Sequence, residues 1–171
     1  MPKRILVVMM LMSWLMISGV SAQESDNLTT FQPSESFITF EYPANWLARE
    51  NGRVIALASD ESVLPLDLNQ PLASGQFKIL LVYLTAEQRA QANIRGTDLD
   101  NILASVVANG NLTITADNIR QYEFNRHLAI RADFANESNQ GTVWLMQMDD
   151  DAVVLMQVVT ALGEITQIEN S

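Results

Sequence analysis

The chain has 171 residues, of which 48% are hydrophobic and 18% charged, enough for one globular domain with a sizeable core. The absence of cysteine excludes disulfides, thiolate metal sites and thiol nucleophiles. A formal net charge of −10 repels phosphate groups, and no basic patch with interleaved aromatic residues offsets it, so we expect no nucleic-acid partner.

The amino-terminal residues have the pattern of an export signal. Lys3 and Arg4 give a positive start, residues 5–20 are an apolar run, and Val20-Ser21-Ala22 supplies the small residues that precede a cleavage site. The run is short for a spanning helix, which needs about 20 apolar residues. We expect residues 1–22 to be a cleaved signal peptide, with retention as an anchor as the alternative. The protein is then exported, whether secreted, periplasmic or on the outer face of the cell membrane, with no stable membrane span after cleavage.

The first part of the mature chain is predicted to be a flexible lead-in followed by a strand. Residues 23–35 are polar and contain Pro33, as expected of a lead-in. Residues 37–42 alternate apolar and polar side chains with the period of a strand. Pro43 cannot donate to a sheet ladder and is expected to end this strand. The turn that follows directs Trp46 back as an apolar plug at the end of the sheet.

Two further strands are predicted on either side of a long connection. Residues 53–59 resume the extended pattern after the turn signal Asn51-Gly52. Residues 60–76 contain two prolines and a glycine and are expected to be a surface connection. Residues 77–84 are nearly continuous in apolar β-formers, which predicts a central strand covered on both faces.

Two helices follow. Thr85 is the expected N-cap of a helix over residues 86–95, which Gly96 ends. A second helix is predicted within residues 97–110, capped by Asp98 or by the threonine before it. Its apolar stripe consists of Leu99, Ile102, Leu103, Val106 and Val107.

The remaining segments have the pattern of antiparallel strands. Residues 111–125 hold one long or two short strands, and the segment 127–136 alternates strictly from Leu128 to Phe134. Residues 141–148 and 152–159 flank the aspartates at 149–151 as a hairpin. Strands, then helices, then strands predict an α+β domain with an antiparallel sheet.

Two stretches resemble the opening of the PsbP/Mog1-like superfamily: ESFITFEYPANW at 35–46 and NGRVIALASDESV at 51–63. The later strands, over residues 120–159, are similar in layout to the family's meander, and the resemblance covers roughly residues 34–165. It implies a single domain over residues 36–171, with an antiparallel sheet of six to seven strands in an α/β/α sandwich. Such domains usually close with a helix, whereas this chain stops at EITQIENS, so the closing helix is expected to be missing or cut to its first turn.

The superfamily resemblance also implies a kind of function. Its members serve as accessory or partner-binding proteins, among them photosystem II extrinsic subunits and binders of the GTPase Ran. No residue of this chain matches a functional motif of either branch, so neither partner transfers to it.

Four aromatic residues are the candidates for a ligand or partner surface: Tyr42, Trp46, Tyr83 and Trp144. Aromatic side chains line apolar pockets and interfaces. Packing at the end of the sheet is the alternative for Tyr42 and Trp46, and we favour it because Tyr-Pro followed by Trp is a packing pattern rather than a catalytic one.

The sequence offers few residues for catalysis or for metal binding. His127 is the only histidine, and Asp133 or Glu123 could assist it as a general base only if the fold brought one of them close. The aspartates at 149–151 lack the spaced ligands of a Ca²⁺ loop, so we expect an acidic hairpin turn.

Three methionines on neighbouring predicted strands need a separate interpretation. Met146, Met148 and Met156 are soft thioether ligands that could hold Cu(I). Methionine more often fills a core. We favour core packing here and expect no metal site and no cofactor.

The sequence therefore favours a non-catalytic exported accessory domain that binds another envelope or secreted protein, or that self-associates. The alternative is a carrier of a small apolar ligand, with a pocket between sheet and helices lined by Trp46, Tyr83 and Trp144. A hydrolase is the third and least supported hypothesis, because no catalytic constellation is visible.

Overall fold

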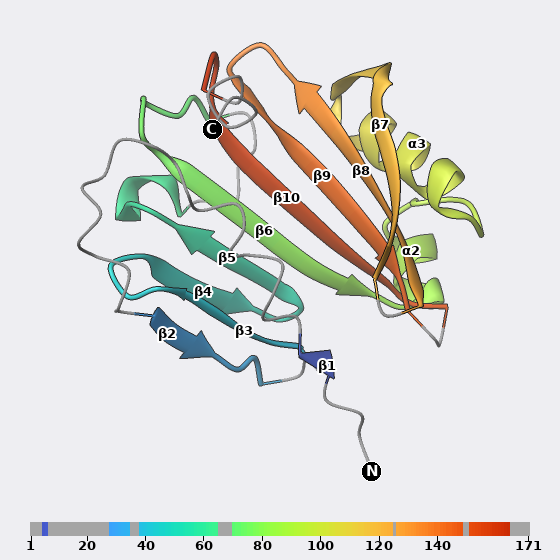
Figure 1. The fold of residues 1–171 in the computed structure, drawn as a ribbon, viewed down its shortest axis with the longest axis horizontal. Coiled ribbons are helices and arrows are strands. Elements are labelled where there is room, and N and C mark those ends of the chain that lie inside the picture. The colour runs from blue at the N-terminus through green and yellow to red at the C-terminus, as the bar shows by residue number, and fades with distance from the viewer. Residues whose placement is uncertain are drawn as a thin grey trace.

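The computed structural model describes residues 5–6, 28–34, 38–64, 70–124, 126–148 and 151–164. Its centre is a seven-stranded sheet with the order β4-β5-β6-β10-β9-β8-β7, in which every neighbouring pair is antiparallel (Figure 1). The strands are β4 (Leu47–Asn51), β5 (Val54–Ala58), β6 (Phe77–Leu84), β7 (Thr113–Phe124), β8 (His127–Ala135), β9 (Asn139–Gln147) and β10 (Val153–Ala161). The expected antiparallel sheet of an α+β fold is confirmed.

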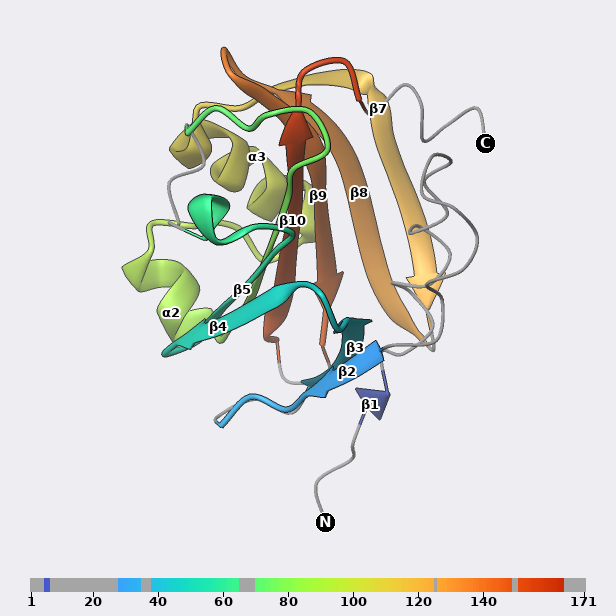
Figure 2. The same cartoon turned by 90° about the vertical axis from the view of Figure 1, so that its left-hand side faces the viewer.

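Two helices pack on one face of this sheet, as Figure 2 shows. They are α2 (Ala86–Gln91) and α3 (Leu99–Gly110); a short 3-10 helix, η1 (Glu61–Val63), follows β5. Ile102, Leu103 and Val106 of α3 are buried against the sheet, as the predicted stripe requires. We call the side under these helices the helix face and the opposite side the second face.

The helix starts agree with the predictions. Thr85 caps α2 by accepting a hydrogen bond from the backbone N–H of Gln88, whose side chain bonds back to the N–H of Thr85. Asp98 caps α3 through the N–H of Asn101. The first helix ends earlier than predicted, at Gln91, because Asn93 takes a left-handed conformation with φ of 56°.

A second, small sheet has the order β1-β3-β2, with β1 (Ile5–Leu6), β2 (Leu28–Phe31) and β3 (Ile38–Pro43). The strand β2 lies within the segment 23–35 that was expected to be a lead-in, and that expectation is wrong for its four residues. They pair antiparallel with β3, and the ring of Phe31 packs 5.4 Å from that of Phe40. This long-range contact orders a polar segment that has no strong pattern of its own.

The strand β4 was not predicted, because its five residues, LAREN, include two charged residues and no β-branched or aromatic one. It forms the edge of the large sheet and pairs with β5 through the turn at Asn51-Gly52, where Gly52 has φ of 59°. The strand β6 lies between β5 and β10, which confirms its predicted interior position.

The connection between β5 and β6 is not purely a surface segment. Val63, Leu64 and Leu72 are buried in the core cluster of the helix face. The fully buried amide of Asn139 holds this connection: its Oδ1 accepts from the N–H of Leu72 at 2.9 Å, and its Nδ2 donates to the carbonyl of Gln70 at 2.9 Å. The expected surface connection over 60–76 is corrected accordingly for its described residues.

The expectations about the two ends of the chain fall largely outside the described residues. The missing closing helix concerns residues 165–171, and the signal peptide concerns residues 1–22, of which only 5–6 are described. Within the described segments, none of the helices is both long enough and apolar enough to span a bilayer.

Candidate functional site

The two faces of the large sheet differ in how completely their apolar side chains are covered. Among the described residues, the cluster on the helix face has nineteen buried and six half-buried members. The cluster on the second face has only five buried members: Phe40, Ile55, Leu57, Ile79 and Val154. Ten more are half-buried: Phe31, Tyr42, Trp46, Ala48, Leu81, Tyr83, Met146, Met148, Met156 and Val158. Among the described residues, the apolar side chains of the second face are therefore less completely buried than those of the helix face.

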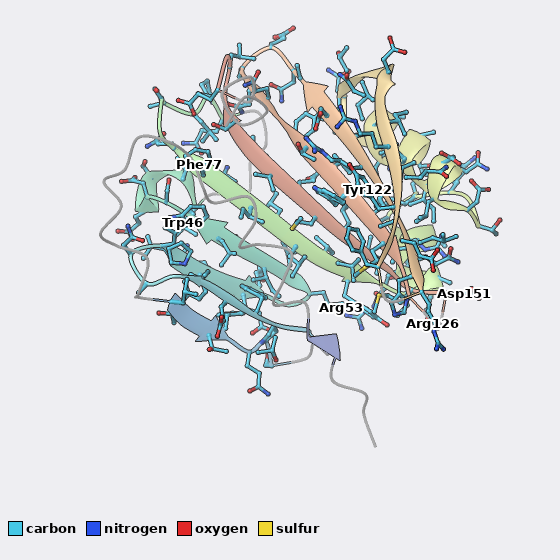
Figure 3. All side chains as sticks on the ribbon, in the orientation of Figure 1. Trp46, Arg53, Phe77, Tyr122, Arg126 and Asp151 are labelled. Carbon is cyan, nitrogen blue, oxygen red and sulfur yellow. The ribbon has the colours of Figure 1, made fainter. Side chains whose placement is uncertain are left out.

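One end of the second face is covered by aromatic side chains from the small sheet. Phe31, Phe40 and Tyr42 pack on one another with ring centroids 5.4 to 6.4 Å apart. Trp46 follows a tight turn in which its N–H donates to the carbonyl of Pro43 at 2.9 Å. Its ring stacks on Phe77 of β6 at 6.3 Å, and both residues are visible at this end in Figure 3. The sequence interpretation of Trp46 as an apolar plug is confirmed.

A second aromatic group occupies the opposite side of this face. The ring of Trp144 on β9 lies 5.1 Å from Tyr122 and 6.2 Å from Phe124, both on β7 (Figure 3 labels Tyr122). Trp144 is buried, whereas the two β7 rings are half-buried. The sequence analysis overlooked Tyr122 and Phe124, although their spacing of two within a predicted strand places both on the same face.

An ion pair between a buried arginine and a half-buried aspartate supports this second group. The guanidinium of Arg131 lies 5.8 Å from the centre of the Trp144 ring. Asp133 accepts from it at 2.9 Å and also accepts from the hydroxyl of Thr142 at 2.8 Å. The arginine is 8% exposed, so the carboxylate neutralises a charge that water barely reaches.

Half-buried methionines and aliphatic residues lie between the two aromatic groups. Met156 of β10 is directly opposite Trp144 on one side and Leu81 of β6 on the other. One step along the strands, Val154 is opposite both Met146 and Tyr83. Cross-strand neighbours on one face have Cβ atoms about 4.5–5.5 Å apart, so these side chains form one continuous strip.

Of the four aromatic residues predicted as a candidate surface, Trp46, Tyr83 and Trp144 lie on the second face, and Tyr42 lies on the small sheet that covers one end of it. Tyr42 packs on Phe31 and Phe40, Trp46 stacks on Phe77, and Trp144 lies across the strip beside Tyr122. Tyr83 belongs to the strip between them.

The expected pocket between sheet and helices is wrong in its lining. Trp46, Tyr83 and Trp144 lie on the face opposite the helices, so they cannot line a cavity beneath α2 and α3. The sequence pattern assigned these residues to strands but could not indicate which side the helices would cover.

The residues considered for acid–base chemistry do not meet. Glu123 is opposite Leu128 while Phe124 is opposite His127, so Glu123 and His127 lie on different faces. Asp133 is six residues along the same strand, about 20 Å from His127. The Nδ1 of His127 lies 3.1 Å from the carbonyl oxygen of Gln147. In the parts of the chain that are described, no three histidine or acidic side chains are grouped as metal ligands.

Only part of the predicted acidic hairpin lies within the described residues. The strands β9 and β10 pair antiparallel as predicted, and the N–H of Met148 donates to the carbonyl of Ala152. Asp149 and Asp150 are outside the described residues. Asp151 has φ of 59°, and its carbonyl accepts from the buried guanidinium of Arg89 at 3.0 Å.

Asp60, Asp98 and Glu164 have a lowered pKa, and each carboxylate holds a cap or a turn in place. The backbone and side-chain N–H groups of Asn101 lower the pKa of the Asp98 cap, and the hydroxyl and N–H of Ser62 lower that of Asp60. At Glu164, burial raises the pKa, but hydrogen bonds from Ser74, Thr160 and Gly75 together outweigh it and leave the pKa lowered. None of these groups is on the second-face strip.

No family model and no curated protein matches the sequence. Solved structures do resemble the fold. The solution structure of cyanobacterial PsbP (CyanoP) from Synechocystis sp. PCC 6803 is similar with a TM-score of 0.52 and 8% identity, over 89% of each chain. A Pseudomonas aeruginosa protein of unknown function, PA94, is similar with a TM-score of 0.44 and 11% identity, over 84% of this chain and 90% of that one.

Proposed function

We propose that this chain, which has the PsbP-like fold, is a non-catalytic exported accessory domain that binds another envelope or secreted protein through the second face of its sheet. The observation that carries the proposal is the unequal covering of the two faces. Ten apolar or aromatic side chains of the second-face cluster, two of them from the small sheet that covers one end, stay half-buried, against six in the helix-face cluster. Partly exposed apolar and aromatic side chains that lie side by side on one face of a sheet are typical of an interaction site.

The composition of the strip supports a protein partner. Interface cores are enriched in tyrosine, tryptophan, phenylalanine and methionine and depleted in charge. The strip contains Tyr83, Met146 and Met156, and Trp144 and Tyr122 adjoin it. Methionine adapts to a partner's shape because its side chain is unbranched and polarisable.

The net charge favours a partner other than a second copy. Each chain carries −10, so two copies repel one another at long range. A neutral partner surface would bind through apolar contacts with the strip, and a basic one would also be attracted by the negative charge of this chain.

Site-directed photo-crosslinking in the host cell tests the proposal. A photoreactive residue is placed at Tyr83 on the strip or at Val158, which follows Met156 on the same face of β10; both are half-buried. In a matched control it is placed at Asn101 or Ala104, which are exposed on α3. We expect one discrete adduct with another exported protein from the strip positions and none from α3. Equal adducts from both sets, a homodimer alone, or no adduct from the strip would contradict the proposal.

A further inference from the structure

The sequence contains two Asn-Gly dipeptides, at residues 51–52 and 109–110, and the structure places them in different settings. Asparagine is a thermolabile residue. A glycine after it leaves the next backbone nitrogen unhindered, because glycine has no side chain. That nitrogen can attack the side-chain amide of the asparagine, at a rate that depends on how freely the surrounding backbone moves.

The first dipeptide lies in an exposed hairpin turn. Asn51 ends β4 opposite Val54, so the turn between β4 and β5 consists of Gly52 and Arg53, of which Figure 3 labels Arg53. A two-residue turn is closed by hydrogen bonds between its flanking residues, so the N–H of Gly52 is not used in the ladder. The three residues from Asn51 to Arg53 are exposed. Within the described part of the chain, no hydrogen bond holds the side chain of Asn51.

The same turn leaves room for the two groups to meet. Gly52 has φ of 59°, a conformation that suits glycine. Among the described residues, no atom beyond its chain neighbours lies within 4 Å of the position that a Cβ at Gly52 would take. The backbone nitrogen of Gly52 can therefore approach Cγ of Asn51 without displacing a packed neighbour.

The second dipeptide is held in a helix. Asn109 and Gly110 are the last two residues of α3, where each N–H donates to the carbonyl four residues back. The side-chain amide of Asn109 donates to the carbonyls of Ala92 and Asn93, both at 3.3 Å. Attack by the nitrogen of Gly110 therefore requires the end of α3 to open first, whereas attack in the hairpin requires only a rotation within the turn.

We propose that Asn51 is a site of spontaneous deamidation, at which the backbone nitrogen of Gly52 displaces the side-chain amide and water completes the conversion. The nitrogen of Gly52 loses its proton and bonds to Cγ of Asn51, the Cγ–N bond of the amide breaks, and ammonia leaves. Water then opens the cyclic imide. Opening at Cγ gives aspartate, and opening at the main-chain carbonyl gives isoaspartate, in which the chain continues through Cβ and Cγ. The sum of the two steps is the hydrolysis of one amide to a carboxylate and ammonium, with no change in oxidation state.

Both products change the edge of the large sheet. Each adds one negative charge to the −10 of the chain. Isoaspartate also inserts a further carbon into the main chain, at the residue that closes the two-residue turn. The neighbouring Glu50 accepts from the N–H of Ser34 at 3.1 Å and from its hydroxyl at 2.7 Å, so the change adjoins the contact between β4 and the segment after β2. The site goes beyond the proposed function, because the reaction needs neither a partner protein nor the strip.

Peptide mass spectrometry tests the site. The full chain is incubated in mildly alkaline buffer made with H₂¹⁸O, which favours the deprotonated nitrogen, and is then digested in ordinary water. We expect the peptide that contains Asn51 to gain one ¹⁸O atom and to separate into aspartate and isoaspartate forms. Asn109 should convert more slowly by about tenfold or more, because its helix must open first. In concentrated urea the two asparagines should convert at similar rates, since a glycine follows each.

A matched variant separates this reaction from background hydrolysis. Asn51→Gln has a longer side chain that would have to close a larger, less favourable ring, so it should abolish conversion at this position and leave Asn109 unchanged. The proposal is overturned if Asn51 stays intact in the folded chain while it converts in urea, if Asn109 converts as fast as Asn51 in the folded chain, or if Asn51→Gln gains as much ¹⁸O at this position as the wild type. None of these readings depends on the photo-crosslinking result, so the two proposals fail separately.

Discussion

At the scale of single residues, the second face depends on one buried charge being matched. Arg131 is 8% exposed, and Asp133 supplies the carboxylate that accepts from both its Nε and a terminal nitrogen, at 3.1 and 2.9 Å. Thr142 donates to the same oxygen. This network fixes the arginine beside the Trp144 ring, so the geometry of the aromatic group follows from it.

Replacing Asp133 with asparagine tests this dependence. The neutral amide leaves the guanidinium poorly compensated, and we expect a loss of about 2 kcal/mol in the free energy of unfolding, measured by urea denaturation. Asp117→Asn, at an exposed position of β7, is the control and should change stability by less than about 0.5 kcal/mol. Equal effects of the two changes would show that the ion pair contributes nothing specific.

A second single-residue prediction concerns a close approach between strands. A Cβ added at Gly141 would lie 2.1 Å from the carbonyl oxygen of Val158 and 2.6 Å from the ring of Phe134. Gly141→Ala should therefore destabilise the protein by about 3 kcal/mol or more in thermal or urea unfolding. Gly110→Ala, where the nearest atom is a side-chain carbon of Leu112 at 3.1 Å, should cost much less. A Gly141→Ala protein as stable as the wild type would contradict the described packing of β9 against β10.

At the scale of elements, the turn after β10 is held to the loop before β6 by one carboxylate. Glu164 accepts from the hydroxyls of Ser74 and Thr160, both at 2.6 Å, and from the N–H of Gly75 at 2.8 Å. These bonds outweigh the effect of burial and lower its pKa below the usual 4.5. Because the folded-state pKa is lowered, the stabilisation is present above pH 4.5 and is lost as the pH falls through the folded value.

The expected consequence is a pH-dependent difference between the wild type and Glu164→Gln. Unfolding free energies measured from pH 7 to pH 3 should show the wild type more stable at neutral pH, with the gap narrowing below about pH 4.5. Ser74→Ala, which removes one donor, should show the same trend with a smaller gap. A gap that stays constant over this range would mean that the carboxylate does not hold the turn.

Local signals predicted the elements that depend on local contacts. The N-caps Thr85 and Asp98 were identified because capping is a short-range hydrogen bond, and the α3 stripe because helical periodicity is visible in twelve residues. The strands β2 and β4 were missed because both are short and polar and are ordered by pairing with distant or neighbouring strands. Their local sequence carries little of that information.

The candidate site was predictable only in part, for a similar reason. Runs of β-forming residues already assign Tyr83, Met146 and Trp144 to strands, and the register of the strands then places them on one face. Which face the helices cover is a property of the whole fold, so the pocket expected between sheet and helices was assigned to the wrong side. The ion pair between Arg131 and Asp133 could not be predicted from the sequence, because two charged residues at a spacing of two are common in exposed strands.

At the scale of the whole molecule, the protein is an antiparallel sheet with one well-covered face and one partly covered face. The helices and the β5–β6 connection complete the first core, whereas β2 and β3 lie toward the β4–β5 side of the second face, as Figures 1 and 2 show. The structural similarity to CyanoP is one of fold, at 8% identity. The proposed binding role therefore depends on the second face itself.

Hydroxyl-radical footprinting, performed on the purified protein and in the host cell, tests the role of the second face most directly. Met146, Met156 and Tyr83 should be labelled in the purified protein and protected in the cell, where the partner is present. Leu128 and Leu162, which are 58% and 53% exposed, should be labelled equally in both. Equal labelling of the strip in both settings would contradict the account, because nothing would then cover the second face where the protein works.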